Sequence, residues 1–199
     1  MKKTTGHPVP SCLGRVPEGL PLDRAACGKA LEAALAAPSL DERTACTRLL
    51  WLLDPRPETI DPRDVAHALA RLCRFGGHVR RFYSVAQHSL LVADLVPFGF
   101  ELAGLLHDAS EAYLGDVVAP LKAHLPAYRA IEARLDRVVE ERFGLARGLL
   151  EAPEVRAADA RALDREAADL FDGRGGTRPL SPPAGGAAFL DRLRALGAF

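Results

Sequence analysis

Apolar residues in the second half of the chain recur at the spacing of an α-helix. Over residues 126–143, Ile131, Leu135 and Val138 fall on one helical face between polar positions, which predicts an amphipathic helix that Gly144 would close. The same reasoning predicts further helices over residues 62–73, 84–95, 100–113, 153–171 and 187–196. No segment of useful length alternates between apolar and polar residues, so we predict an all-α fold.

The pattern divides the chain into three parts. Residues 1–46 are expected to be an N-terminal extension, partly irregular, with one or two helices over about 23–37 and 40–52. Residues 47–172 hold the strongest helical pattern and the candidate chemistry, and are predicted to be the main domain. Residues 173–199 begin with a Gly/Pro-rich loop and end in a helix that we expect to pack on that domain.

The composition is that of an ordinary soluble protein without net charge. The chain has 199 residues, 48% hydrophobic and 26% charged, and its 26 acidic side chains balance 26 Lys and Arg residues. Without a global positive field, a nucleic-acid polymer is a poor partner, whereas a few local charges suffice for a small phosphorylated metabolite. The apolar runs are short and the N-terminus lacks an apolar core, so we expect neither a membrane span nor a signal peptide. The four cysteines show no C-x-x-C spacing and are expected to be reduced thiols of a cytoplasmic protein.

Candidate metal chemistry begins with His107 and Asp108, which follow an apolar run. A lone histidine in a buried helix is usually a hydrogen-bonded core residue. A buried carboxylate beside it needs a partner, however, and one cation would serve both. With His88 upstream and Asp159 downstream, these residues make a four-ligand set of nitrogen and oxygen donors. Such a set suits Mn, Fe, Co, Ni, Zn or Mg, with positions left for water, and indicates metal-assisted hydrolysis.

Two acidic residues follow the His-Asp pair. Glu111 lies three residues beyond Asp108 and four beyond His107, hence on the same helical face. It is either a solvated helix charge or the group that orients or deprotonates a metal-bound water. Asp116, after Gly115, is a turn or cap residue by its position alone.

Basic residues precede and follow these positions. Arg74, Arg80 and Arg81 would ordinarily form a solvated loop, but arginines near a metal site can bind phosphate oxygens bidentately. His78 in the same loop is either a phosphate or second-layer contact or a packing residue. Lys122, usually a surface residue, joins the same pool of candidate phosphate contacts.

The segment over residues 107–122 (HDASEAYLGDVVAPLK) resembles the signature of the HD-domain metal-dependent phosphohydrolases. It is most similar to the branch that contains the bacterial 5'-deoxynucleotidases and the phage and bacterial deoxynucleotide phosphohydrolases. Residues 64–69 (DVAHAL) and 74–89 (RFGGHVRRFYSVAQHS) resemble the same group closely. The resemblance covers about residues 49–171, so the main domain is expected to be an HD domain.

The resemblance implies an all-helical HD fold with a single divalent metal site between helices. Its ligands would be His88, His107, Asp108 and Asp159. Asp164 and Asp169 lie near Asp159 in the sequence, but the local pattern favours Asp159 as the last ligand. In that family the residue matching Glu111 is needed for hydrolysis. The resemblance also places Asp116 beside the sugar and the attacked phosphate, and makes it a second catalytic candidate.

The substrate pocket is implied in the same way. The pair Arg74 and Phe75 corresponds to an Arg and an aromatic residue that line the nucleotide pocket. The nucleotidases often carry Trp where Phe75 stands, so the selectivity for sugar and base is expected to differ.

The expected function is a metal-dependent phosphohydrolase of nucleotides or deoxynucleotides, in which a metal-bound hydroxide attacks a phosphate. A 5'-nucleotidase and a triphosphate phosphohydrolase both fit. Hydrolysis of a cyclic dinucleotide, an alarmone or short oligonucleotides is the alternative, although the Gly-Tyr-Pro motif usual in cyclic-dinucleotide enzymes is absent. A non-catalytic nucleotide-sensing module is a further alternative; a structural metal site would normally be Cys-rich. We expect a small-molecule nucleotide ligand, no polymer or membrane partner, and a homo-oligomer.

Overall fold

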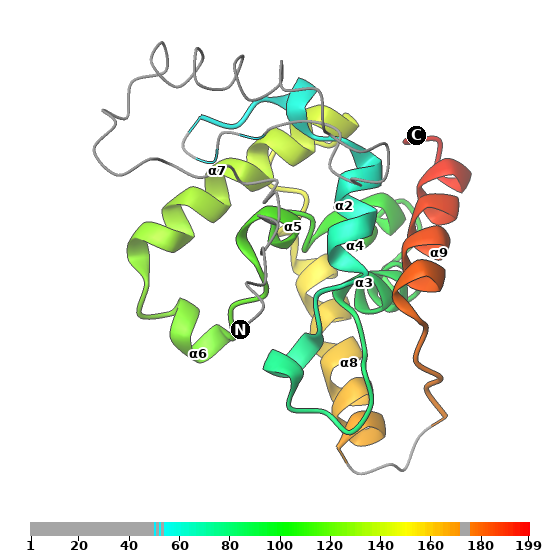
Figure 1. Cartoon of the computed structure of the whole chain (residues 1–199). Helices are drawn as coiled ribbons and strands as arrows, with labels where there is room; N and C mark the ends of the chain where they lie inside the picture. The colour runs from blue at the N-terminus through cyan, green and yellow to red at the C-terminus, as the bar shows by residue number, and fades with distance from the viewer. Residues whose placement is uncertain (1–49, 51, 53, 172–175) are drawn as a thin grey trace, which may run out of the picture.

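The described part of the chain folds into α-helices and short 3-10 turns. A computed structural model describes residues 50, 52, 54–171 and 176–199, which form no β-strand and only one isolated bridge, between Cys73 and Ser84. The all-α prediction is confirmed for these residues. In chain order the elements in Figure 1 are η1 (Pro57–Thr59), α2 (Pro62–Leu69), η2 (Arg74–Gly77), α3 (Val85–Leu95), α4 (Glu101–Leu106), α5 (Glu111–Leu114), α6 (Ala119–Lys122), α7 (Pro126–Phe143), α8 (Pro153–Leu170) and α9 (Pro182–Ala195).

Local signals in the sequence explain where several helices begin and end. The Asp61 carboxylate accepts a hydrogen bond from Arg63 N at 2.9 Å at the start of α2, and Ser84 Oγ accepts one from Gln87 N at 3.2 Å at the start of α3. α7 spans the predicted residues and ends before Gly144, which adopts a left-handed φ of +68°. These boundaries are therefore set by the local sequence.

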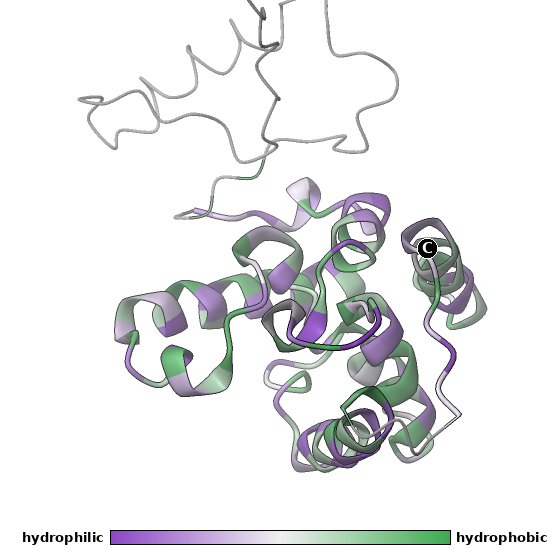
Figure 2. Ribbon diagram, turned by 60° about the horizontal axis from the view of Figure 1, so that its bottom comes forward, coloured by the Kyte–Doolittle hydropathy of each residue, from purple (hydrophilic) through white to green (hydrophobic). Residues whose placement is uncertain are grey.

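α3 lies in the middle of the helical assembly. It packs against α4, α8 and α9, and α9 also packs against α2. Their buried apolar side chains belong to a core that includes Val65, Leu69, Leu105, Leu106 and Phe189. Figure 2 shows hydrophobic and hydrophilic residues mixed along the helices, as expected when each helix turns one face inward. The arrangement places α3 next to both α4 and α8, from which the other candidate ligands come.

The helix predicted over residues 62–73 ends earlier, at Leu69. Beyond this point the chain pairs with the segment that leads into α3: Arg74 N donates to Tyr83 O at 2.9 Å and Val85 N donates to Leu72 O at 3.0 Å. This pairing uses backbone groups that a longer helix would have needed, so the prediction of a continuous helix to residue 73 is wrong.

The continuous helix predicted over residues 100–113 is also wrong. α4 ends at Leu106 and α5 begins at Glu111. Between them Ala109 N donates to Leu106 O at 2.9 Å and Glu111 N donates to Asp108 O at 3.0 Å, bonds that join residues three apart and tighten the chain. His107 and Asp108 therefore stand in a turn between two short helices.

The C-terminal helix, predicted over residues 187–196, begins five residues earlier, at Pro182. Ser181 Oγ accepts a hydrogen bond from Ala184 N at 3.4 Å, and proline is well suited to the first turn that follows. These signals outweigh the weak helix propensity of Gly185 and Gly186, which led to the later start.

Among the described helices, none combines the length and the apolar character that crossing a bilayer requires.

The N-terminal extension over 1–46 and the helix predicted over 23–37 lie outside the described residues, as does all of the helix predicted over 40–52 except residues 50 and 52.

Candidate metal centre

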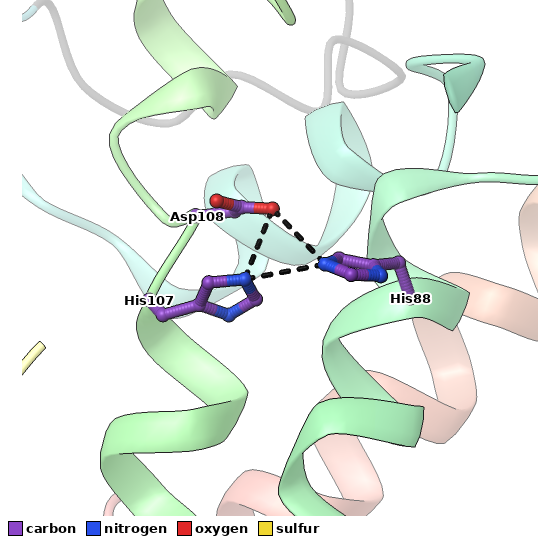
Figure 3. A group of neighbouring side chains, drawn as sticks. All are labelled: His88, His107 and Asp108. Atoms are coloured by element: carbon purple, nitrogen blue, oxygen red, sulfur yellow. Dashed lines mark hydrogen bonds and ion pairs between the residues drawn. The ribbon is translucent and has the colours of Figure 1, made fainter. Parts of the chain in front are cut away.

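Three side chains converge on one point between α3 and the α4–α5 turn (Figure 3). His88 Nε2 lies 3.2 Å from His107 Nε2 and 3.6 Å from Asp108 Oδ2, and His107 Nε2 lies 3.2 Å from the same oxygen. His88 is fully buried, and the side chains of His107 and Asp108 are largely buried. Two imidazoles and a carboxylate at these separations can hold a metal ion.

A glycine allows α4 to approach α3 closely. A Cβ at Gly104 would lie 3.0 Å from Val96 Cγ1 and 3.2 Å from Ala93 Cα, closer than side chains ordinarily pack. The Gly104 carbonyl accepts a hydrogen bond from His107 Nδ1 at 2.9 Å. Since a carbonyl can only accept, Nδ1 carries a proton, and in the neutral ring the Nε2 lone pair then faces His88 and Asp108.

Asp159, on α8, reaches the same point. Its Oδ1 lies 3.1 Å from His88 Nε2 and 3.9 Å from His107 Nε2, and its side chain is 45% exposed. Asp164 is exposed, and Asp169 accepts a hydrogen bond from the backbone N of Thr177 at 3.0 Å. Of the three acidic residues considered, Asp159 is the one that the structure brings to the two histidines.

The separations fit one ion in octahedral coordination. Two ligand atoms at right angles, each about 2.1 Å from an ion, lie about 3.0 Å apart, and two on opposite sides lie about 4.2 Å apart. Within the group of His88, His107 and Asp108 the separations run from 3.2 Å to 3.6 Å, and Asp159 Oδ1 lies 3.1 Å and 3.9 Å from the two histidine Nε2 atoms, all within this range. The donors are imidazole nitrogens and carboxylate oxygens, which suit Mn, Fe, Co, Ni, Zn or Mg.

The charges around this point also favour a cation. Asp108, Asp159 and Glu166 lie around the two histidines together with one guanidinium, that of Arg74, so with neutral imidazoles three negative charges less one positive charge leave two negative charges. Burial acts to raise the pKa of Asp108, but the neighbouring imidazoles and guanidinium lower it. The pKa of Asp159 is likewise lowered by the imidazoles, against burial. A divalent cation would balance the remaining charge.

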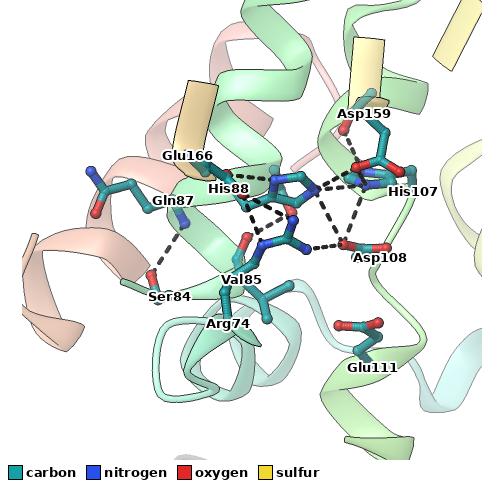
Figure 4. Close-up of polar contacts among 12 residues, drawn as sticks. Arg74, Ser84, Val85, Gln87, His88, His107, Asp108, Glu111, Asp159 and Glu166 are labelled. Atoms are coloured by element: carbon teal, nitrogen blue, oxygen red, sulfur yellow. Dashed lines mark hydrogen bonds and ion pairs between the residues drawn. The ribbon is translucent and has the colours of Figure 1, made fainter. Parts of the chain in front are cut away.

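Glu166 is a buried carboxylate that the sequence alone did not single out. Its Oε1 lies 2.7 Å from His88 Nδ1, and its Oε2 accepts hydrogen bonds from Arg74 Nε at 3.2 Å and Nη2 at 3.0 Å (Figure 4). Arg74 Nη1 also lies 3.9 Å from Asp108 Oδ2. The available signal was the spacing of seven residues from Asp159, which puts both carboxylates on one face of α8.

These carboxylates also affect His88. Burial alone would lower the pKa of His88, but hydrogen bonds to Asp159 and Glu166 raise it to about 8. Arg74, predicted as a substrate contact, is bound to Glu166, and its role toward a substrate stays a prediction.

Glu111 faces the group from the beginning of α5 (Figure 4). Its side chain is 7% exposed, and its Oε1 lies 3.7 Å from Lys122 Nζ. Its Oε2 has no hydrogen-bond partner within the described part of the chain. Burial and the carboxylates of Asp108 and Asp116 raise the pKa of Glu111 to about 10, so it is protonated at neutral pH in this environment.

Asp116 and Lys122 lie beyond α5. Burial, aided by Asp108, raises the pKa of Asp116, while Arg74 opposes this rise. Lys122 Nζ lies 2.6 Å from Glu132 Oε1, so the lysine charge is already balanced by a carboxylate.

The remaining predicted substrate contacts lie in and after η2. Phe75 adopts a left-handed φ of +57°, which is strained for a residue with a side chain, and its ring packs edge-on against Phe171 with centroids 5.1 Å apart. His78, Arg80 and Arg81 are exposed. Their contact with a substrate stays a prediction.

Two bacterial proteins are similar to this chain. The uncharacterized protein YfdR of Escherichia coli is 46% identical over 107 residues, which are 54% of this chain and 59% of YfdR. The match therefore spans less than two thirds of the length of YfdR. The uncharacterized protein RCAP_rcc00048 of Rhodobacter capsulatus is 39% identical over 142 residues, which are 65% of this chain and 72% of that protein. No protein-family model matches the chain.

The extent and identity of the second match indicate common descent. The chain belongs to the same family as RCAP_rcc00048 of Rhodobacter capsulatus.

Proposed function

We propose that this chain is a divalent-metal-dependent phosphohydrolase of the HD type that hydrolyses nucleotides, with deoxynucleotides as the favoured class. The observation that carries the proposal is the convergence of His88, His107 and Asp108 on one point, which Asp159 also approaches, with the buried Glu111 beside it. The resemblance of residues 107–122 to the HD signature supports the same reaction class.

The two imidazoles and two aspartates would hold the ion. When bound, such an ion acts as a Lewis acid that polarises a phosphoryl oxygen and makes water more acidic. His88 and His107 each turn Nε2 toward this point, and Asp108 contributes Oδ2. The helices α3, α4 and α8 thus fix the donors before any ligand arrives, which limits reorganisation during the reaction.

Glu111 is proposed to be the catalytic acid and base. Its Oε2, buried and without a partner among the described residues, is free to exchange a proton with an oxygen of the reacting groups. Its pKa of about 10 reflects burial next to other carboxylates. A cation beside Asp108 would lower that pKa toward neutrality, where a group can both give and take a proton effectively. Asp116, also with a raised pKa, is proposed to assist at the sugar side.

The charges near the site favour a monophosphate over a triphosphate. The two basic groups that lie near Asp108 and Glu111 are already paired, Arg74 with Glu166 and Lys122 with Glu132. A triphosphate tail would need further fixed positive charges, and the candidates Arg80 and Arg81 lie on an exposed loop. We therefore propose deoxynucleoside monophosphates as the preferred substrates.

Release of inorganic phosphate or pyrophosphate from a nucleotide panel tests the proposal. The chelator-treated full-length protein is assayed with deoxynucleoside mono-, di- and triphosphates and the corresponding ribonucleotides, each with Mn, Co, Mg or Zn. Cyclic dinucleotides, an alarmone and short oligonucleotides are included as alternatives. We expect metal-dependent release of phosphate, fastest with a deoxynucleoside monophosphate.

Three variants connect the reaction to the site. His107→Ala is expected to lose both turnover and metal binding, and His67→Ala, a histidine on α2, is the matched control that should keep both. Glu111→Gln keeps the shape of the side chain and is expected to bind metal normally but to lose turnover. Metal binding without hydrolysis of any compound would replace the proposed enzyme with a sensing module. Full turnover by Glu111→Gln would remove this residue from the mechanism.

A further inference from the structure

Glu166 is the most deeply buried acidic side chain near the proposed metal centre, with no exposed surface. Both of its carboxylate oxygens are used. Oε1 lies 2.7 Å from His88 Nδ1, and Oε2 accepts two N–H groups of Arg74, at 3.0 Å and 3.2 Å. A carboxylate held in this way needs no solvent contact and cannot rotate without breaking these bonds.

The geometry determines which nitrogen of His88 carries the proton. An ionised carboxylate can only accept hydrogen bonds, so His88 Nδ1 must donate its proton to Glu166 Oε1. The neutral ring then has its lone pair on Nε2, the atom 3.1 Å from Asp159 Oδ1 and 3.6 Å from Asp108 Oδ2. His107 is set in the same sense by the Gly104 carbonyl.

We propose that Glu166 is a positioning residue that fixes His88 as the Nδ1–H tautomer and so presents its Nε2 lone pair to the metal ion. This inference rests on the metal centre of the proposed function. It adds a residue that does not touch the ion, and it explains why an acidic side chain lies in the interior of α8. Carboxylate partners of ligating histidines commonly contribute tenfold or more to metal affinity.

Arg74 explains why glutamine would not replace Glu166. The guanidinium offers only N–H donors, so in a Glu166→Gln variant it would hold the amide oxygen. The amide NH₂ would then face His88 Nδ1, which would have to accept. The ring proton would move to Nε2, where it blocks the donor atom of the proposed metal site.

The matched control is Glu140, on α7. It is also buried, at 4% exposure, and its Oε1 accepts a hydrogen bond from the backbone N of Leu150 at 3.2 Å. Glu140→Gln makes the same chemical change in a buried acid. Unlike Glu166, this acid contacts a backbone group and not a candidate metal ligand. Comparing the two variants separates the loss of a buried charge from the loss of the His88 contact.

The experiment measures Mn²⁺ affinity by competition with a metal-chelating dye, using the chelator-treated full chain. We expect Glu166→Gln to bind about 10- to 100-fold more weakly than the unsubstituted chain. Glu140→Gln should bind as the unsubstituted chain does. Glu166→Asp, which restores an acceptor-only group, should recover part of the affinity. This variant also keeps the inference testable if Glu166→Gln does not fold, as judged by circular dichroism.

A spectroscopic measurement distinguishes positioning from general support of the fold. Long-range ¹H–¹⁵N correlation spectra of the metal-free protein at about pH 9, where neutral imidazoles report their tautomer, should show His88 as Nδ1–H. In Glu166→Gln the same residue should appear as Nε2–H. A His88→Gln variant identifies the resonance by its absence.

The outcomes separate this inference from the proposed function. Unchanged affinity in Glu166→Gln overturns the inference, and so does weaker binding with an unchanged His88 tautomer, since Glu166 would then act only through the fold. If the unsubstituted chain binds Mn²⁺ with these variant effects but hydrolyses no nucleotide, the proposed function fails and the inference stands. If His107→Ala does not weaken Mn²⁺ binding, the metal centre fails and the inference fails with it.

Discussion

A single methyl group on α4 should disturb the proposed metal centre without touching any of its ligands. Gly104 lies where α4 meets α3, and its carbonyl holds the ring of His107. In a Gly104→Ala variant the new Cβ would lie 3.0 Å from Val96 Cγ1 and 3.2 Å from Ala93 Cα. The valine side chain can turn aside, but the alanine contact is with the backbone of α3, so the two helices must separate by a few tenths of an ångström.

Two opposing effects set the expected change in stability. Overpacking of a close helix contact costs about 1–3 kcal/mol. Alanine is a better helix former than glycine by about 1 kcal/mol, which offsets part of this. The net expectation is a loss of about 0–2 kcal/mol in the free energy of unfolding. Because His88 is on α3 and His107 follows α4, the same separation should weaken metal binding by about tenfold, or about 1.4 kcal/mol.

Chemical denaturation of the metal-free protein measures the first effect, and Mn²⁺ competition measures the second. Gly186→Ala is the matched control, since this glycine also lies within a helix, but its nearest contacts are at 3.4 Å and 3.5 Å, where a methyl group fits. That variant should be as stable as the unsubstituted chain or more stable, with unchanged Mn²⁺ affinity. If Gly104→Ala binds Mn²⁺ as tightly as the unsubstituted chain, the approach of α3 to α4 does not set the spacing of the histidines.

Three further predictions concern pH, metal removal and a helix cap. Burial raises the pKa of Asp136 to about 7, above its unfolded value of 3.8, so the folded state binds this proton more tightly. The resulting stabilisation is fully present below about pH 4 and is lost as the pH rises through about 7, by at most about 4 kcal/mol. Asp136→Asn should flatten this part of the plot of unfolding free energy against pH. An unchanged plot would contradict the assignment. Chelating the metal should lower the free energy of unfolding by about 2.7 kcal/mol relative to protein held at a free metal concentration of about 100 times Kd, and His107→Ala should abolish this difference. Ser84→Ala removes the hydroxyl that caps α3 and should cost about 1 kcal/mol in thermal or chemical unfolding, and an unchanged stability would contradict this role of the hydroxyl.

The helix boundaries that could be predicted are those with local causes. α7 starts at a proline and ends before a left-handed glycine, and α3 starts after a serine whose hydroxyl accepts a backbone hydrogen bond. These features act within a few residues, so the sequence alone carries them. The break between α4 and α5 has no such local signal, because the residues between them are compatible with a helix.

That break lies at the candidate metal centre. Adjacent residues of a regular helix point about 100° apart, so a local change in the backbone alters how His107 and Asp108 are directed toward His88. The tightened turn brings Asp108 Oδ2 to 3.2 Å from His107 Nε2 and 3.6 Å from His88 Nε2. Hydrophobic periodicity describes burial and does not report such a local change in the backbone.

The candidate ligands and their supporting residues differ in the same way. Histidine and aspartate in a patterned run are chemically distinctive, so His88, His107 and Asp108 could be named in advance. Glu166 could not, because glutamate on an amphipathic helix is ordinarily a solvated charge, and only the fold shows that it lies at 0% exposure against His88 and Arg74. Similarly, the sequence does not reveal that Lys122 forms an ion pair with Glu132, and therefore that the lysine charge is already balanced.

The distribution of buried charge connects the fold to the proposed reaction. Three carboxylates and one guanidinium meet where α3, α4 and α8 come together, and each would be costly to bury alone. Glu166 and Arg74 form a hydrogen-bonded ion pair, and the other oxygen of Glu166 lies 2.7 Å from His88 Nδ1. Arg74 is closer to Glu166 than to Asp108, so with neutral imidazoles Asp108 and Asp159 carry the two remaining negative charges of this group. The Glu166–Arg74 pair thus orients His88 and has no net charge, whereas Asp108 and Asp159 supply negative charge that a bound cation would balance. A preformed site that binds and releases a metal ion needs both kinds of residue.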